Sequence, residues 1–222
     1  DSVRVISNTI FAKSSGGHST QFGFVPGYCS NQSLFEKNEI RVNASSVNYG
    51  IYLSHSDATA GTENLLINNF VSTHNSTSTT YGIYQYYCDY LKVYHNSVNI
   101  SDGNSSSAAF YSYSGSNVTL KNNIFANTKT SGGYAIYSYN TSGITESNYN
   151  NLYTEGSNLG YWSGNRTNLT NWQSGSGKDA NSVSADPIFT SDTDLHAFSI
   201  HCDGQANSSL GITEDIDNKQ RN

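Results

Sequence analysis

Three apolar positions and one asparagine recur along the chain in a fixed arrangement. The asparagines lie 27 to 31 residues apart and are Asn8, Asn38, Asn69, Asn96 and Asn123. Val, Phe or Leu stands three residues before each of them, and Ile, Val or Phe stands two residues after. A third apolar column follows 13 to 16 residues later, with Phe24, Ile51, Ile83, Phe110 and Ile136. The repeat predicts a small unit that is stacked several times, since one such unit cannot bury its apolar face alone.

Each repeat has room for three short strands separated by turns. We expect the asparagine to occupy a bend, because Asn tolerates the left-handed conformation and hydrogen-bonds locally. In stacked coils these side chains lie about 4.8 Å apart, so their amides bond to one another along the axis. The pattern predicts an all-β parallel helix of about five to six coils.

This repeat resembles the right-handed parallel β-helix repeat family over roughly residues 1–155. The right-handedness is implied by the resemblance and by the general rule for parallel crossovers. Residues 156–222 carry "DPIF", "DLH" and "DIDN", with Asn218 where the family has glycine. They resemble the tail that closes this module in large, modular, secreted bacterial surface proteins. The resemblance implies a capping segment of the same domain and an extracellular or cell-surface location.

The sixth repeat departs from the template. Glu146 falls where an apolar residue is due, and Tyr149 falls on the asparagine column. Beyond it we expect a short helix around residues 169–173 and then an extended return. Such a tail would cover the strand edges of the last coil, which otherwise invite pairing with another chain. The amino end opens in strand register, so we expect further coils or modules before it in the same chain.

Composition excludes several classes of partner. Only 13% of the residues are charged and the net charge is −6, whereas nucleic acids and anionic membrane surfaces need clustered Lys and Arg. No stretch approaches the roughly 18 apolar residues of a membrane span, so we expect no membrane insertion. With 17 Tyr and 9 Phe, the chain has too much aromatic surface for a disordered segment.

The segment "YGIYQYYC" at residues 81–88 places four tyrosines in one predicted strand. Related runs begin at residues 49, 108 and 134. Strict alternation puts Tyr81 and Ile83 toward the core and Gly82, Tyr84 and Tyr86 toward solvent. Small residues in the glycine position of the four strands leave the approach to this outer face open.

The predicted outer face carries columns of aromatic rings. The candidate binding residues are Tyr52, Tyr84, Tyr86, Tyr111, Tyr113, Tyr137, Tyr139 and Trp162. Large exposed apolar patches mark interaction sites, and the ring face and hydroxyl of Tyr suit sugars. We therefore expect a non-catalytic module that binds a polysaccharide, a cell-surface glycan or a surface partner. A purely structural ladder, a covered face and rings that point inward remain alternatives.

A polysaccharide lyase or glycoside hydrolase of β-helix fold is the second functional hypothesis. Hydrolysis of a glycosidic bond needs two carboxylates about 5–9.5 Å apart. The candidate strands 21–27, 49–55, 81–87, 108–114 and 134–140 contain no Asp, Glu, Lys or Arg. We therefore expect no catalytic residues and no cofactor or metal. A structural spacer or filament subunit, whose coils stack end to end, is the third hypothesis.

Asp57 and Asp89 keep the catalytic alternative open, because they occupy equivalent places on adjacent coils, near His55. They are an acid–base pair, part of a calcium site or turn caps.

The three cysteines indicate free thiols. Cys29 and Cys88 share one column, with Ser56 between them. Two coils separate the pair by roughly 10 Å, beyond the reach of a disulfide. The sequence leaves Cys202 open. No Cys/His spacing resembles a zinc site, and no nucleotide loop or nucleophile elbow is present.

Overall fold

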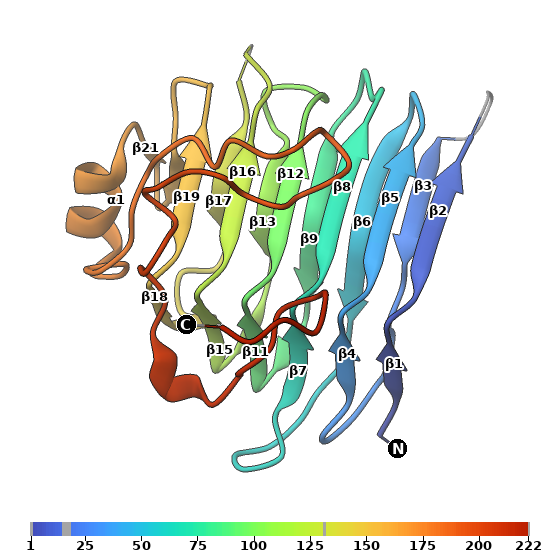
Figure 1. The fold of residues 1–222 in the computed structure, drawn as a ribbon. Coiled ribbons are helices and arrows are strands. Elements are labelled where there is room, and N and C mark those ends of the chain that lie inside the picture. The colour runs from blue at the N-terminus through green and yellow to red at the C-terminus, as the bar shows by residue number, and fades with distance from the viewer. Residues whose placement is uncertain (1, 15–18, 131, 222) are drawn as a thin grey trace.

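A computed structural model describes residues 2–14, 19–130 and 132–221 and shows a parallel β-solenoid (Figure 1). Three parallel sheets run along its axis, and each contributes one strand per coil to six coils. This confirms the fold class expected from the repeat.

The strands fall into three long sheets, which we call A, B and C. Sheet A consists of β1 (Arg4–Ile6), β4 (Leu34–Glu36), β7 (Asn64–Ile67), β11 (Leu91–Tyr94), β15 (Val118–Lys121) and β18 (Ile144–Asn148). Sheet B consists of β2 (Thr9–Lys13), β5 (Glu39–Asn43), β8 (Phe70–His74), β12 (Ser97–Ile100), β16 (Ile124–Asn127) and β19 (Asn151–Thr154). Sheet C consists of β3 (Thr20–Phe24), β6 (Val47–Ser54), β9 (Thr80–Tyr86), β13 (Ala108–Ser112), β17 (Tyr134–Ser138), β20 (Gly160–Trp162) and the antiparallel β21 (Asn165–Arg166). Two short strands, β10 (Cys88–Asp89) and β14 (Gly115–Ser116), pair between sheets C and A.

The three apolar columns of the repeat form one continuous core. The fully buried members are Phe35, Leu66, Val93 and Leu120 in sheet A, Ile40, Val71, Val98 and Phe125 in sheet B, and Ile51, Ile83, Phe110 and Ile136 in sheet C. Strand pairing brings each member directly onto its counterpart, as in Val71–Val98 and Phe110–Ile136. Burial is therefore shared between coils, as expected for a solenoid.

A ladder of asparagine side chains runs along the bend between sheets A and B. Each Oδ1 accepts from the Nδ2 and the backbone N–H of the preceding coil's asparagine. The Nδ2–Oδ1 distance is 3.1 Å for Asn96 and Asn123, as the sequence predicted for adjacent coils. Asn96 Nδ2 also donates to the carbonyls of Leu66 and Tyr94. The buried amides thus meet the rule that buried polar groups are paired.

The sixth coil continues the ladder, which corrects two expectations. Asn150, and not Tyr149, accepts from Asn123 Nδ2 at 3.0 Å. Glu146 lies outside the core, while the buried Ser147 pairs with Leu120. The physical reason is that the spacing stays at 27 residues between these asparagines.

The left-handed residue of the bend is the one before each ladder asparagine, and not the asparagine itself. These residues have φ between 54° and 59° and are Ser7, Lys37, Asn68, His95, Asn122 and Tyr149. Among the described residues no ladder asparagine has a positive φ. The ladder side chain is thereby free to turn inward and bond along the axis, while the preceding side chain points away from the core.

The facing of the tyrosine strands differs in part from strict alternation. Ile83 is buried and Tyr84 and Tyr86 lie on the outer face, as expected, but Gly82 is buried and Tyr81 is outside. Two consecutive residues face inward, as in a bulge. A Cβ on Gly82 would lie 2.2 Å from Val98 Cγ1. The glycine is required because sheet C packs directly on the valines of sheet B.

Helix α1 (Leu169–Ser176) closes the carboxyl-terminal end of the core, at the place expected for a short helix. Its fully buried Trp172 fills the space over Gly160 and donates from Nε1 to Asp179 Oδ2 at 2.7 Å. Asp179 Oδ1 and Ser182 Oγ accept from Asn150 Nδ2 and its backbone N–H. These two oxygens replace the next asparagine, so the ladder ends with its donors paired.

The remaining tail runs back along the solenoid and covers two of its three outer faces. Residues 187–200 form a hairpin that crosses β16, β12 and β8 of sheet B (Figure 1). Leu210 and Ile212, around η1 (Ser208–Leu210), pack on Leu34, Ile67 and Tyr94 of sheet A. The outer face of sheet C is left uncovered by the described part of the tail. This asymmetry distinguishes sheet C from the other two.

Replacing Asn96 with alanine tests the ladder. The variant leaves buried donors and acceptors on two neighbouring coils unpaired, and each such group costs about 1–3 kcal/mol. We expect the free energy of unfolding, measured by urea denaturation, to fall by about 3 kcal/mol. Asn8→Ala is the control, because Asn8 is exposed at the first coil, and should lose less than about 1 kcal/mol. Equal losses for the two variants would contradict a cooperative ladder.

Candidate functional site

The outer face of sheet C is covered by three rows of aromatic rings, which we call the tyrosine face. Row 1 contains Phe22, Tyr49, Tyr81 and Tyr134. Row 2 contains Tyr52, Tyr84, Tyr111, Tyr137 and Tyr161. Row 3 contains Tyr86, Tyr113 and Tyr139. The structure therefore gathers on one face all the tyrosines that the sequence singled out, with their rings outward.

The rings of row 2 stack face to face along the solenoid axis. Their centroids lie 4.7 Å apart for Tyr84 and Tyr111, 4.8 Å for Tyr111 and Tyr137 and 4.3 Å for Tyr137 and Tyr161. The interplanar angles of these pairs are 4°, 7° and 5°. Neighbouring rings thus occupy most of one another's faces. A ligand on the middle of this row meets ring edges and hydroxyls rather than open ring faces.

Row 1 contributes edge-to-face contacts that fix row 2. Tyr81 lies 4.8 Å from Tyr84 at 72° and 5.0 Å from Tyr111 at 73°. Aromatic pairs of this kind each contribute about 0.5–1.5 kcal/mol beyond their buried area. The sequence analysis missed row 1, because the two consecutive inward residues moved Tyr81 to the outer face.

The tyrosine face carries no formal charge. Strands 20–24, 47–54, 80–86, 108–112, 134–138 and 160–162 contain no Asp, Glu, Lys or Arg. Burial, followed by the neighbouring tyrosines, raises the pKa of Tyr81 to about 12 and that of Tyr84 and Tyr111 further above the ordinary value. The hydroxyls therefore remain protonated and present neutral donors and acceptors.

Trp162 does not belong to the tyrosine face, contrary to the sequence-based expectation. It pairs with Ser138, is 9% exposed and packs against Trp172 with 5.7 Å between the ring centroids. Tyr161 takes the outward place and stacks on Tyr137. The physical reason is a shorter connection into β20, which shifts the strand by one residue and so exchanges the two faces.

A second aromatic column lies in the turn that follows sheet C. Tyr28, His55 and Tyr87 stack with centroid distances of 5.2 and 5.4 Å. All three have positive φ, between 48° and 54°, which is uncommon for bulky residues. The recurrence of an aromatic residue just after the strands is a signal that the sequence contained and that the analysis did not use.

A cleft of about 350 Å³ opens where this turn column meets row 3. It is lined by Tyr87, Tyr113, Ser114, Tyr139 and Asn140. Row 3 ends here, and Tyr139 is 61% exposed. The cleft therefore combines an accessible ring with polar side chains.

Asp57 and Asp89 form a turn contact rather than a catalytic pair. Asp57 Oδ1 accepts from the backbone N–H of Asp89 at 3.2 Å, and Asp89 Oδ1 accepts from Ser116 Oγ at 2.8 Å. The two carboxylates thus belong to a column of side chains that links successive turns. Across residues 2–14, 19–130 and 132–221, no group of three or more His, Cys, Asp or Glu is arranged to hold a metal ion.

The cysteines are free, as expected for Cys29 and Cys88. The backbone N–H of Cys29 donates to Ser56 Oγ at 3.3 Å, which confirms the column that joins these residues. Burial raises the pKa of the Cys88 thiol to about 12, so the thiol is unreactive. Cys202 is also free and lies 3.1 Å from Asn151 Nδ2.

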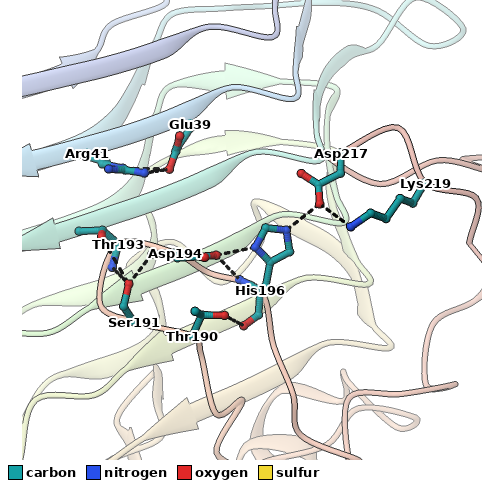
Figure 2. Close-up of polar contacts among 9 residues, drawn as sticks. All are labelled: Glu39, Arg41, Thr190, Ser191, Thr193, Asp194, His196, Asp217 and Lys219. Atoms are coloured by element: carbon teal, nitrogen blue, oxygen red, sulfur yellow. Dashed lines mark hydrogen bonds and ion pairs between the residues drawn. The ribbon is translucent and has the colours of Figure 1, made fainter.

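A polar cluster in the tail joins its two arms (Figure 2). His196 Nδ1 contacts Asp194, and His196 Nε2 lies 2.9 Å from Asp217 Oδ2, which also accepts from Lys219 Nζ at 3.1 Å. Ser191 Oγ is bonded to the backbone N–H of Asp194 and has no printed contact with the imidazole. The arrangement holds residues 187–200 against residues 213–221 and resembles a clamp more than a catalytic triad.

The "DIDN" segment also has a structural role. Asp215 Oδ1 accepts from the backbone N–H groups of Asp217 and Lys219 at 2.9 and 2.8 Å. These bonds favour the turn interpretation of this segment.

A wider groove of about 840 Å³ separates the two arms over the asparagine bend. Its polar side chains mostly bind the tail. Asn68 Nδ2 donates to the Glu214 carbonyl at 2.9 Å, and Asn122 Nδ2 donates to the Asn207 carbonyl at 3.0 Å. Burial lowers the pKa of His95, on the same bend, to about 3. The groove is therefore an attachment surface for the tail.

No protein family, no curated protein and no solved structure matches this chain. What the chain itself defines is a parallel β-solenoid with one uncovered, uncharged and tyrosine-lined face. Among the described residues, no helix has the length and apolar character needed to cross a membrane.

The tail clamp predicts a dependence on pH. Partial burial lowers the pKa of His196, but hydrogen bonds to Asp194 and Asp217 outweigh this and raise it. A raised pKa gives stability that is complete below the unfolded value and is lost as pH rises through the folded value. Amide hydrogen exchange in both arms, corrected for intrinsic rates, should be slower at about pH 6 than at about pH 8. His196→Gln should remove the difference, and an unchanged difference in that variant would contradict the clamp.

Proposed function

We propose that this chain is a non-catalytic binding module, and that the tyrosine face binds an extended, neutral glycan. The observation that carries the proposal is the asymmetry of the three outer faces. The tail covers sheets A and B, whereas the face with the greatest aromatic surface is left open. Proteins rarely leave a large apolar patch exposed without a use.

The repeat of the face favours a polymer over a small molecule. Ring centroids within row 2 recur every 4.3 to 5.3 Å along the axis, so a ligand with a regular repeat meets the same groups on each coil. Each row presents hydroxyls that neither carry charge nor attract ions. A contribution on the order of 1 kcal/mol per ring gives weak binding to each sugar, and several contacts along one polymer strengthen it through avidity.

We further propose that the chain belongs to the right-handed β-helix repeat family and acts at a cell surface or outside the cell. The regular coil and the closing tail support this proposal, together with the tail motifs. An open edge at coil 1, where Asn8 Oδ1 accepts no described hydrogen bond, suits a further β-coil as a neighbour.

The catalytic alternative has less support, because Asp57 and Asp89 are engaged in turn contacts. Its discriminating test is a survey of oligosaccharides released from pectin, alginate and chondroitin. Cleavage that disappears in Asp57→Asn would favour a lyase or hydrolase. A spacer or filament subunit would instead bind no glycan and would increase in size with concentration.

The binding proposal is tested by removing hydroxyls without disturbing the stacked rings. The variant Tyr84/Tyr111/Tyr137→Phe keeps row 2 but lacks three hydroxyls. On a glycan array we expect the wild type to bind neutral extended glycans and the triple variant to bind them at least about tenfold more weakly, since each hydrogen bond contributes about 0.5–1.5 kcal/mol.

The matched control is Tyr94/Tyr149/Tyr153→Phe, which removes three hydroxyls away from the tyrosine face. It should bind as the wild type does. Equal binding by the two triple variants would contradict the proposal and leave row 2 as a structural ladder.

A further inference from the structure

The three rows of the tyrosine face end differently at the last coil. The antiparallel strand β21 folds back beside Tyr161, which pairs with Asn165, and Tyr134 donates its hydroxyl to Asn165 Oδ1 at 3.0 Å. Rows 1 and 2 are thus closed by Asn165. Row 3 ends at Tyr139, and the equivalent place on coil 6 holds the small, exposed Ser163. Tyr139 therefore keeps one ring face without an aromatic neighbour.

The cleft beside Tyr139 has the size and composition of a subsite for one sugar. Its volume of about 350 Å³ lies at the small end of ligand pockets. Tyr113 stacks under Tyr139 at 5.1 Å and 5°, which fixes the orientation of the open ring. Tyr87 forms the opposite wall.

The polar groups of the cleft are oriented in advance. Asn140 Oδ1 accepts from the backbone N–H of Ser142 at 3.1 Å and from Ser142 Oγ at 2.8 Å. These two bonds fix which side of the amide is the oxygen, so Nδ2 is the free donor of this side chain. Among the described residues, neither Asn140 Nδ2 nor Ser114 Oγ has a protein partner.

We infer that this cleft binds one pyranose ring of a neutral polysaccharide, with a flat C–H face of the sugar on Tyr139 and its hydroxyl rim on Asn140 Nδ2 and Ser114 Oγ. The inference rests on the proposed function and specifies it. Elsewhere on the tyrosine face the sugar meets ring edges, so this cleft sets the position of the polymer along the axis. The absence of cationic side chains from its lining disfavours uronic acids.

The experiment is a titration of protein labelled with ¹³C in its tyrosine rings, with cellohexaose as a neutral probe and polygalacturonate as a charged one. We expect saturable shifts of the Tyr139 and Tyr113 resonances with cellohexaose and none with polygalacturonate. Tyr139→Ala should weaken the binding of cellohexaose about tenfold, the equivalent of one strong ring contact. Asn140→Asp keeps the oxygen that binds Ser142, loses the donor and should also weaken binding.

Tyr28→Ala is the control, because Tyr28 is 78% exposed and lies outside the cleft. It should bind cellohexaose as the wild type does. Thermal unfolding of each variant excludes a general loss of fold. Unchanged affinity in Tyr139→Ala, an absence of cellohexaose binding, or preference for polygalacturonate would each overturn the inference. Loss of glycan-array binding in the row 2 variant with no effect of Tyr139→Ala would overturn this subsite alone, whereas a wild type that binds no glycan would overturn the proposed function as well.

Discussion

Hydrogen bonding between the asparagines of successive coils is the constraint on which the rest of the structure depends. Each ladder amide donates to the next Oδ1 at 2.9 to 3.1 Å, and the backbone N–H of the same residue donates to that oxygen as well. A slip of one residue would break these bonds and exchange the inner and outer faces of the following strands. The ladder therefore fixes one register for the core and for the outer columns together.

That register also accounts for the tyrosine face. Once the coils are aligned, outward tyrosines at equivalent positions must stack, and the 4° and 7° angles in row 2 show nearly parallel rings. Stacking stabilises the sheet but uses the ring faces that a sugar would otherwise contact. A structural ladder and a binding surface are thus the same object, with hydroxyls in the middle and an open ring at Tyr139. The tail leaves this face free while it covers the other two.

The sequence was sufficient for the fold because asparagine and three apolar columns kept constant offsets over five coils. It was insufficient where the offsets changed. A shortened connection into β20 put Tyr161, and not Trp162, on the outer face, and the inward Gly82 moved Tyr81 outward. Tail contacts such as His196 with Asp217 join segments without a repeat, so no periodicity predicted them. The outward facing of Tyr84, Tyr111 and Tyr137 was predictable, because these residues follow the buried isoleucine or phenylalanine directly.

The most direct test of the central claim, that the tyrosine face is an open surface that binds a neutral polymer, is hydroxyl-radical footprinting of the tyrosines. In the free protein, oxidation should be strong at Tyr139 and weak at Tyr94, which is 9% exposed beneath the tail. Addition of a soluble neutral β-glucan should protect the tyrosines of rows 2 and 3 and leave Tyr28 and Tyr153 unchanged. Little oxidation of the tyrosine face in the free protein, or no protection of that face by the polymer, would contradict the account.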